Sequence, residues 1–373
     1  MINSENDSES LIDEDGFEVI REYRSHDPSE ELRSNPMALV FPLTPSDALA
    51  YEALFVHPRK RPADFRTRPL EERKEWLDRM NECHYPFQGE IGVLQKVSSL
   101  VRMSLAPRHP GNPAVMAFIL KIAQGREATL PRMSDAGAGG GLGLLLTGPS
   151  GTGKSCLIDR VVRYFGRHAR IHLTLNDRPC RWAQLGVIRI SAQTTWAGTL
   201  EQINREIDRQ LGRNILSTRS QSLSATKLQP AVWAALTTGF APLLIIDEFQ
   251  RLRRLHPSEA LKILEGLIDL MQDGGLPVIV VGTVKIRHLL RQFPSEMSKF
   301  SNAGGFEFER LKEGDDDTEN FILLLKDQHV SCSDIQYSAE FSRYLVLHGM
   351  GVRRIIREFV AATVYLTTPA SFR

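Results

Sequence analysis

The sequence feature that most constrains the fold is a glycine-rich turn between an apolar run and a helical pattern. Residues 148–155 read GPSGTGKS, which fits the pattern G-x-x-x-x-G-K-[ST] of a phosphate-binding loop. The apolar run 142–147 precedes the turn and predicts a buried strand, and residues 156–165 carry apolar side chains at helical spacing. A chance glycine-rich turn would not need both flanks. We therefore expect a strand–loop–helix unit that binds a nucleoside triphosphate.

Each position of this loop has a physical task. Gly148, Gly151 and Gly153 let the backbone turn tightly and aim N–H groups at phosphate oxygens. Lys154 is expected to reach the β- and γ-phosphates, and the Ser155 hydroxyl to ligate Mg²⁺ at the positive end of the helix. The expected cofactors are ATP and Mg²⁺. The expected cofactor-binding residues are Gly148, Pro149, Ser150, Gly151, Thr152, Gly153, Lys154, Ser155 and Cys156.

Composition excludes several classes of protein. The 373 residues are 42% hydrophobic and 24% charged, with a formal net charge of +1, so the whole chain is not a strongly basic nucleic-acid binder, although local patches remain open. No apolar run is long enough to cross a bilayer and the N-terminus is acidic, so we expect neither a signal peptide nor a membrane anchor. The four cysteines lack metal-ligand spacing. This pattern predicts a cytoplasmic protein without disulfides or structural zinc.

Changes in pattern along the chain predict four parts. Residues 1–31 hold eleven acidic residues against two arginines and are expected to form a disordered tail. Residues 32–135 are expected to form a mostly helical N-terminal extension for partner docking, because 91–105 is amphipathic at helical spacing. Residues 136–311 alternate apolar strands with helices, which predicts an α/β core with a central parallel sheet covered on both faces. Residues 312–373 are expected to form a helical lid.

Within the core and the lid, the pattern predicts the bounds of each element. Strands are expected at 142–147, 187–191, 243–246, 278–281 and 306–308. Helices are expected at 154–165, 200–211, 230–237, 258–271, 284–293, 318–327, 339–348 and 352–366.

A second motif, PLLIIDE at 242–248, ends an apolar strand with two carboxylates. Asp247 is expected to hold Mg²⁺ through its water shell, and Glu248 to polarise the water that attacks the γ-phosphate. Acidic pairs after apolar strands are common and can be solvated turns. This pair follows a phosphate-binding loop by about a hundred residues, with strands between, which favours ATP hydrolysis.

With these motifs in this order the chain resembles an AAA+ ATPase, and more narrowly the TnsC/TniB transposition regulators. LLIIDEFQRL at 243–252 is similar to the strand, acidic pair and following glutamine of that group, and VGTVKIRHLL at 281–290 is similar to its next strand and helix. Upstream, LVRMSLAPRHPGNP at 100–113 and the pair Asn35–Pro36 are similar in position to its N-terminal region.

The resemblance implies further site residues. Thr283, which ends the strand VIVVGT, would sense the γ-phosphate, although a threonine can also simply cap a strand. In the run GVRRIIR at 351–357, Arg353 or Arg354 would reach the nucleotide from the lid, or would form an exposed basic helix start. A neighbouring subunit would supply a cation from 287–302. The candidates there are Arg287, Arg291 and Lys299.

The resemblance also implies a function and partners. Such proteins bind ATP, assemble into rings or helical filaments on duplex DNA, and contact its backbone without reading the sequence. They link a TniQ/TnsD-like target selector to a DDE transposase of the TnsB/TniA kind, and hydrolysis dismantles the assembly. The chain departs from the pattern in two places. Lys299 is the nearest cation before the last strand, where arginines are expected. After the lid helix only residues 367–373 remain for a transposase contact, so that contact is expected to be short or elsewhere.

Two segments are candidates for contact with DNA. A ring-lining loop is expected near strand 187–191, where Arg178 and Arg181 would contact phosphates and Gln193, Thr194 and Thr195 would donate hydrogen bonds. A solvated hairpin is the alternative. The basic run HPRKRPADFRTR at 57–68 is the second candidate, or else a solvated face.

Three functions therefore remain open at this stage. The first is an ATP-dependent, DNA-bound regulator of transposition with slow, regulatory hydrolysis. The second is a STAND-like ATP-switch signalling protein that binds protein partners only, which the acidic tail and the near-neutral charge suit. The third is a helicase- or clamp-loader-type enzyme.

Overall fold

The structure is a computed structural model and describes residues 17–20, 22–24, 26–56, 64–65, 68–69, 71–72, 83–123, 141–175, 178–213, 225–328 and 338–366. The chain divides into two compact units. The first unit contains Met1–Thr44, Lys96–Leu146 and Val162–Phe306, and the second contains Pro45–Gln95, Thr147–Val161 and Glu307–Arg373. The phosphate-binding loop is therefore grouped with the helices of the lid, and the acidic pair with the main sheet.

The first unit is built on a five-stranded sheet in the order β5-β6-β7-β2-β8. The strands are β2 (Gly143–Thr147), β5 (Ile188–Ser191), β6 (Leu244–Asp247), β7 (Val278–Val281) and β8 (Gly305–Glu307). The pairs β5–β6, β6–β7 and β7–β2 are all parallel, and helices separate these strands along the chain. The predicted α/β fold with a central parallel sheet is confirmed.

The helices of the first unit follow the predicted order. α1 (Pro36–Leu39), α5 (Pro113–Ala123), α7 (Trp196–Gln210), α9 (Ala225–Thr238), α10 (Pro257–Gln272), α11 (Arg287–Gln292) and α12 (Pro294–Lys299) lie within it. α4 (Gln88–Leu105) and α6 (Lys154–Phe165) contain unit boundaries. Short 3₁₀ helices occupy Glu30–Leu32, Phe249–Arg254 and Val284–Ile286. The helix expected at 284–293 is thus a 3₁₀ turn followed by α11, and Pro294, which restricts the residue before it, starts α12.

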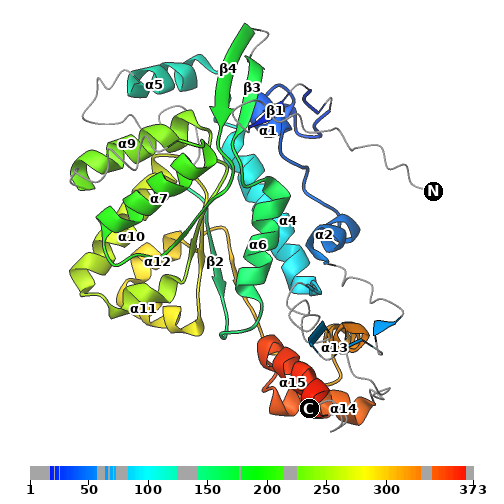
Figure 1. The fold of residues 1–373 in the computed structure, drawn as a ribbon. Helices are drawn as coiled ribbons and strands as arrows, with labels where there is room; N and C mark the ends of the chain where they lie inside the picture. The colour runs from blue at the N-terminus through cyan, green and yellow to red at the C-terminus, as the bar shows by residue number, and fades with distance from the viewer. Residues whose placement is uncertain are drawn as a thin grey trace. The chain divides into compact units, whose positions relative to one another are not determined.

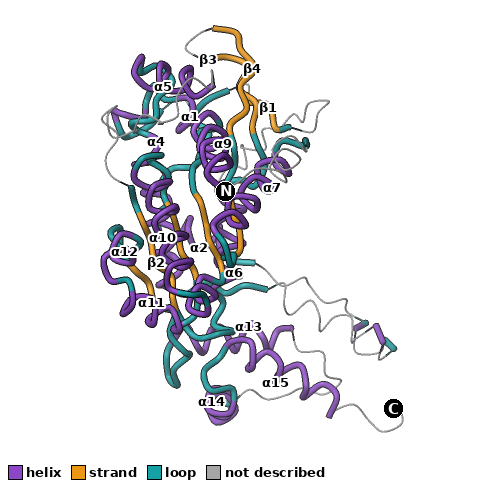
Figure 2. Tube along the Cα trace, turned by 90° about the vertical axis from the view of Figure 1, so that its left-hand side faces the viewer, coloured by secondary structure: helices purple, strands orange, loops and turns teal. Residues whose placement is uncertain are grey.

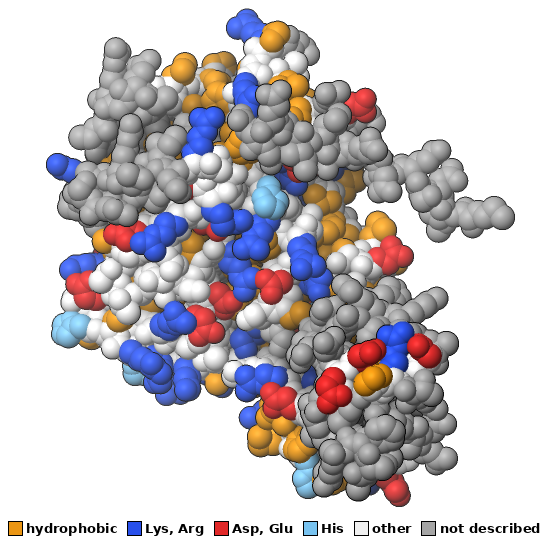
Figure 3. Space-filling model, in the orientation of Figure 1, with side chains coloured by type: hydrophobic (Ala, Val, Ile, Leu, Met, Phe, Trp, Pro, Cys, Tyr) orange, Lys and Arg blue, Asp and Glu red, His pale blue; other side chains and the backbone are white. Residues whose placement is uncertain are grey.

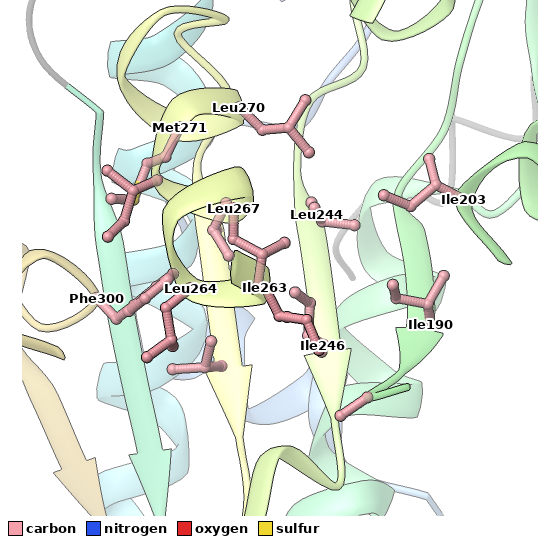
Figure 4. Close-up of a cluster of buried hydrophobic side chains, with 14 of the residues drawn as sticks. Ile190, Ile203, Leu244, Ile246, Ile263, Leu264, Leu267, Leu270, Met271 and Phe300 are labelled. Atoms are coloured by element: carbon pink, nitrogen blue, oxygen red, sulfur yellow. The ribbon is translucent and has the colours of Figure 1, made fainter. Parts of the chain in front are cut away.

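The core of the first unit lies between the sheet and the layer of α7, α9 and α10, which Figure 1 shows on one side of the strands. Strand residues alternate between faces, so Leu244 and Ile246 of β6 point into this layer. Apolar side chains of α10 recur at helical spacing and meet them (Figure 4), among them Ile263 and Leu267. Leu267 is fully buried, so truncating it to alanine is expected to cost about 2–5 kcal/mol.

A second, three-stranded sheet in the first unit differs from the sequence prediction. β3 (Arg170–Leu175) and β4 (Arg178–Gln184) form an antiparallel hairpin, and β1 (Glu18–Ile20) runs parallel to β3. Figure 2 shows the three strands side by side. The residues of β1 fall in the segment expected to be a disordered tail. They are held by the backbone pairing and by an ion pair of 3.0 Å between Glu18 Oε2 and Arg170 Nε. Residues 1–16 of that tail lie outside the described residues.

The second unit contains the predicted lid helices. α13 (Asp316–Gln328), α14 (Ala339–His348) and α15 (Arg353–Leu366) share a small apolar core with Phe65 and Leu311. α2 (Asp47–Leu54) belongs to the same unit. Buried lid side chains in this core include Phe321, Leu325 and Ile356. The predicted lid helices therefore pack around an apolar core that also includes Phe65 of the N-terminal extension.

Within the described ranges, none of the helices combines the length and the apolar character that a membrane span requires.

Candidate nucleotide-binding site

The phosphate-binding loop has the backbone that its glycines predict. Gly148, Gly151 and Gly153 have φ angles of 154°, 82° and 102°, in the region that side chains with a Cβ rarely adopt. A Cβ on Gly148 would also lie 2.6 Å from the Cβ of Phe308, within the second unit. Only glycine fits these positions, so the turn is fixed before any phosphate reaches it.

Lys154 lies within the curve of this loop. Its Nζ donates hydrogen bonds to the carbonyl oxygens of Gly148 (2.9 Å) and Pro149 (2.5 Å), and its side chain is buried. Thr152 is also buried and donates its hydroxyl to Pro149 O at 2.9 Å. Ser155, the next residue of α6, is exposed. The loop therefore holds its ammonium group in place and leaves the predicted Mg²⁺ ligand accessible.

The lid helix α15 begins against the same loop. The backbone N–H of Arg354 donates to Gly151 O at 3.2 Å, and a Cβ on Gly153 would lie 2.9 Å from Arg353 Nη1. Arg353 is buried, whereas the side chain of Arg354 is 66% exposed and is 3.7 Å from Glu358. Both arginines that the sequence left open therefore lie beside the loop, Arg354 next to Gly151 and Arg353 next to Gly153, and Arg353 is the buried one.

Two residues that the sequence analysis missed pair with Arg353. Glu90, in the first turn of α4, accepts a hydrogen bond of 2.7 Å from Arg353 Nη1. The ring of Phe87 lies 3.5 Å from the guanidinium carbon. These partners are more than 260 residues away from Arg353 in the chain, so no local sequence pattern predicts the contacts.

The acidic edge belongs to the first unit. Asp247 ends β6, and its Oδ2 forms an ion pair of 3.0 Å with Arg189 Nη2 of β5. Its Oδ1 accepts the backbone N–H of Glu248 at 2.8 Å. Arg189 was not predicted, and the available signal was a charged residue inside an apolar strand. The predicted metal ligand is therefore held by a cation on the neighbouring strand.

A glutamine links the predicted base to the predicted sensor. Gln250 Nε2 donates to Glu248 Oε2 at 2.7 Å, and Gln250 Oε1 accepts the backbone N–H of Thr283 at 2.9 Å. Glu248 has a left-handed backbone with φ of 57°, a strained conformation that is common at functional sites. Among the described residues, the buried Oγ1 of Thr283 has no hydrogen-bond partner. Its hydroxyl is therefore free to contact a ligand oxygen.

The register of the sheet places these groups at the edge where β2 ends. Leu146 of β2 pairs with Val281 of β7, and Ile246, which precedes Asp247, pairs with Val280. Thr283 follows β7 by two residues. The last residues of β2, β7 and β6 therefore lie at one edge of the sheet, and the chain enters the phosphate-binding loop directly after β2.

The three candidates for a cation supplied to another subunit lie on one helical stretch. Arg287 and Arg291 are exposed residues of α11, and Lys299 is a half-buried residue at the end of α12. The backbone of Lys299 packs closely against Gly143 of β2. Their predicted role concerns an assembly and stays a prediction.

The predicted DNA contacts fall on two different elements. Arg178 and Arg181 are exposed residues of β4, on the hairpin that the sequence analysis named as the alternative. Gln193 and Thr195 lie between β5 and α7. There Gln193 Nε2 donates to Ser191 O, and Thr195 Oγ1 caps α7 by accepting the N–H of Gly198.

The remaining candidates for DNA contact are Thr194 and the basic run 57–68. Thr194, between β5 and α7, is exposed. Most of the basic run 57–68 lies outside the described residues. On the face drawn in Figure 3, the coloured Lys and Arg side chains lie among Asp and Glu side chains.

Two of three comparisons with known proteins found matches. Residues 139–290 match the family model of an AAA domain, a range that includes the loop, the acidic pair and Thr283. A Walker-type ATPase of Pyrococcus abyssi is among the solved structures that match, with 14% sequence identity over 68% of this chain and 67% of that chain and a TM-score of 0.39. A search of the curated proteins found no match. The chain has an α/β P-loop NTPase fold, and residues 139–290 are similar to AAA domains.

Proposed function

We propose that this protein is an ATP-dependent AAA+ regulator of DNA transposition. It oligomerises on duplex DNA as a ring or helical filament and links a TniQ/TnsD-like target selector to a DDE transposase of the TnsB/TniA kind. Hydrolysis of ATP controls disassembly. The AAA domain supports the ATP-dependent part of this proposal. The resemblance of segments 243–252 and 281–290 to the TnsC/TniB regulators supports the part that concerns transposition.

The single observation that carries the ATPase part is the shared edge of the main sheet. β2 leads into the phosphate-binding loop at the level where β6 presents Asp247 and β7 leads to Thr283. An ATPase needs a phosphate cradle, a metal ligand, a base and a sensor, and the chain supplies a candidate for each of these tasks. The isolated motifs would not require this alignment.

The residues of the two motifs are of the types that fit a magnesium nucleotide. Mg²⁺ prefers oxygen ligands, and the Ser155 hydroxyl and the Asp247 carboxylate supply them. When bound, the ion would neutralise the charge that develops on the β- and γ-phosphate oxygens. Arg189 already compensates the charge of Asp247. The arginine thus holds the carboxylate in one orientation at the edge of the sheet.

The base side of the reaction depends on Glu248 and its glutamine. The Glu248 carboxylate would orient the attacking water and accept its proton. Gln250 holds one carboxylate oxygen by a hydrogen bond and leaves the other to the water. The same amide group bonds Thr283 N, so the base and the sensor hydroxyl are held by one side chain.

Binding to DNA would use backbone contacts. Arg178 and Arg181 on β4 are suited to phosphates, and Gln193 and Thr194 to hydrogen bonds with the DNA backbone. A cation from a neighbouring subunit, with Lys299 as the candidate, would complete the site in the oligomer. Slow hydrolysis would follow from a lysine in a place where arginine stabilises the transition state better.

The proposal is tested by duplex DNA binding with and without ATP at several salt concentrations. We expect binding that requires ATP, that weakens steeply as salt rises, and that produces oligomers whose length follows the length of the DNA. Electron microscopy with an ATP analogue and duplex DNA would show the assembly directly. Monomers that bind ATP and have no affinity for DNA would overturn the DNA-bound regulator.

That outcome would favour the second candidate, a STAND-like ATP switch that binds protein partners only. Two observations about charge favour this candidate over a DNA-binding protein. The formal net charge is +1, and basic and acidic side chains are mixed on the face in Figure 3. Insensitivity of partner binding to salt would separate the switch from the DNA-bound regulator. Strand separation or clamp loading would indicate the third function.

A further inference from the structure

A buried carboxylate of the N-terminal extension lies at the centre of a charged cluster in the second unit. The side chain of Glu90 is only 1% exposed. It accepts hydrogen bonds from Arg353 Nη1 at 2.7 Å and from the backbone N–H of Phe87 at 3.3 Å, and it forms an ion pair of 3.1 Å with His84 Nε2. Burying a carboxylate is costly unless its oxygens are all paired. Glu90 meets that condition, because both of its oxygens have partners.

The partners of Glu90 keep it ionised. Burial by itself would raise the pKa of Glu90, but the positive charges of Arg353 and His84 outweigh it and hold that pKa below its ordinary value. Glu90 therefore presents a fixed negative charge to the guanidinium group of the lid.

Arg353 is positioned almost entirely by this segment of the extension. Glu90 binds one end of its guanidinium group and Phe87 covers its face. The same Nη1 lies beside Gly153 of the phosphate-binding loop. Its Nε is buried and has no hydrogen-bond partner among the described residues, so the group keeps donor capacity for a ligand. A guanidinium held in this way is directed by its partners rather than by its own flexible chain.

The segment also contacts the start of α6. His84 Nδ1 lies 3.2 Å from Sγ of Cys156, the residue that follows Ser155. Residues 83–90 thus contact both the helix that starts at the loop and the arginine of the lid. They connect two parts of the site that are 197 positions apart in sequence, at Cys156 and Arg353.

We propose that Glu90 is a positioning residue, which holds Arg353 against the phosphate-binding loop and so makes the N-terminal extension part of the device that distinguishes ATP from ADP. This proposal rests on the proposed ATP-dependent function of the same site. It assigns to the extension a task in nucleotide recognition besides any docking of partners. A buried ion pair contributes little net stability compared with an apolar pair of the same size, whereas it fixes the direction of a charged group.

The test measures nucleotide affinity in the full chain. All variants carry Glu248→Gln, which prevents turnover during the measurement, and the affinities for ATP and ADP are determined by calorimetry without DNA. Glu90→Gln keeps the size of the side chain and removes its charge. We expect Glu90→Gln and Arg353→Gln each to reduce the ratio of ATP to ADP affinity by about tenfold, with the affinity for ADP nearly unchanged.

A double variant and a matched control complete the design. Because the two residues act as a unit, Glu90→Gln combined with Arg353→Gln should lose no more of the ratio than Arg353→Gln does. Glu358→Gln removes the partner of the neighbouring exposed Arg354 and should leave the ratio unchanged. Arg353→Lys keeps the charge and loses the planar fork, so it should reduce the ratio even if Glu90→Gln proves too unstable to purify.

Three results would overturn the positioning role. One is an equal loss of ATP and ADP affinity in Glu90→Gln. Another is a lower melting temperature with an unchanged ratio, which a purely structural ion pair would give. The last is additive losses in the double variant. Failure of the proposed function would give a different result. A protein that distinguishes ATP from ADP through Glu90 and Arg353 but does not bind DNA would contradict only the role in transposition.

Discussion

The loop side and the acidic edge of the candidate site hold their charged groups by different means. On the loop side Glu90 and Arg353 are nearly inaccessible to water, with side-chain exposures of 1% and 9%, and Lys154 is bound by backbone carbonyls. At the acidic edge Asp247 and Glu248 keep 13% and 46% of their side-chain surface exposed. The difference teaches that the loop side is preorganised for binding, whereas the carboxylates can exchange partners during a reaction.

The largest effect is expected at the loop. Lys154→Ala removes the ammonium group that lies within the loop, so its charge-assisted contacts to phosphate oxygens are lost. We expect a fall in ATP affinity of at least about 100-fold and no nucleotide-dependent assembly, measured by calorimetry and light scattering. An ATP affinity close to that of the wild type would break the assignment of the loop side to binding.

The next effect isolates the acidic edge. Glu248→Gln keeps the shape of the side chain and removes the base. Turnover should fall by about 10²–10³-fold while ATP binding is preserved, which should trap the assembled state; phosphate release and equilibrium binding measure the two quantities. If Lys154→Ala and Glu248→Gln behaved alike in both assays, the division between a binding side and a reacting edge would be wrong.

Two buried histidines, His84 beside Glu90 and His172 in β3, differ in the direction in which their pKa is shifted. Burial lowers the pKa of His84, but hydrogen bonds and charges of Cys156 and Glu90 outweigh it and raise that pKa. His172, in the small sheet of the first unit, meets the hydroxyl of Tyr23 and the amide oxygen of Gln184. There burial dominates, and the pKa of His172 falls to about 4.

The sign of the effect follows from these directions. His172 is neutral in the folded protein, and its pKa is near 6.5 in the unfolded chain. Its contribution to the free energy of unfolding is therefore fully present above pH 6.5 and is lost as pH falls toward 4. The loss amounts to about 3 kcal/mol of unfolding free energy. The contribution of His84 to the free energy of unfolding depends on pH in the opposite direction. It is present below pH 6.5 and is lost as pH rises through the raised pKa of His84.

Urea unfolding between pH 7 and pH 4.5 tests the claim for His172. Since carboxylates also titrate near the lower limit, the relevant quantity is the difference between the wild type and His172→Gln. The variant should show a flatter dependence on pH. An identical dependence in both proteins would mean that burial does not set the charge of His172.

The smallest effect concerns the glutamine at the acidic edge. Gln250→Ala frees one oxygen of Glu248 and leaves Thr283 N without its acceptor. We expect kcat to fall about tenfold with KM for ATP nearly unchanged, because the base loses its orientation and the phosphate cradle does not. Arg251→Ala is the control, since Arg251 is exposed and 4.0 Å from Glu248. A rise in KM instead of a fall in kcat would assign Gln250 to binding.

Much of the core was predictable because its signals are local. The apolar runs of β2 and β7 and the helical spacing of α6 give the observed elements within one residue, and the glycines of the loop have the φ angles that their positions require. The same holds for α14, whose predicted bounds are those of the structure. Hydrophobic periodicity and the glycines that allow a positive φ can both be recognised from neighbouring residues, without knowledge of distant contacts.

The features that were missed depend on partners far away in the chain. The hairpin of β3 and β4, which the sequence offered only as an alternative, contains Pro179 and exposed arginines, which weaken the strand pattern. Gln250 was noted only as part of a resemblance, without a role. Glu90 looked like an ordinary polar residue, because a carboxylate on α4 has no local sign that it meets a lid arginine. Arg189 was visible as a charge within an apolar strand, but only the register of β5 and β6 brings it to Asp247.

The pairing of β1 with β3 has a consequence for synthesis on the ribosome. Glu18 and Arg170 are bonded across 152 residues, and ribosomes add about 5–20 residues per second, so β1 has no partner strand for about 8–30 s after it is made. β4 follows β3 closely in the chain and can pair with it as soon as both are made. Of the three described strands of this sheet, β1 therefore waits longest for a partner.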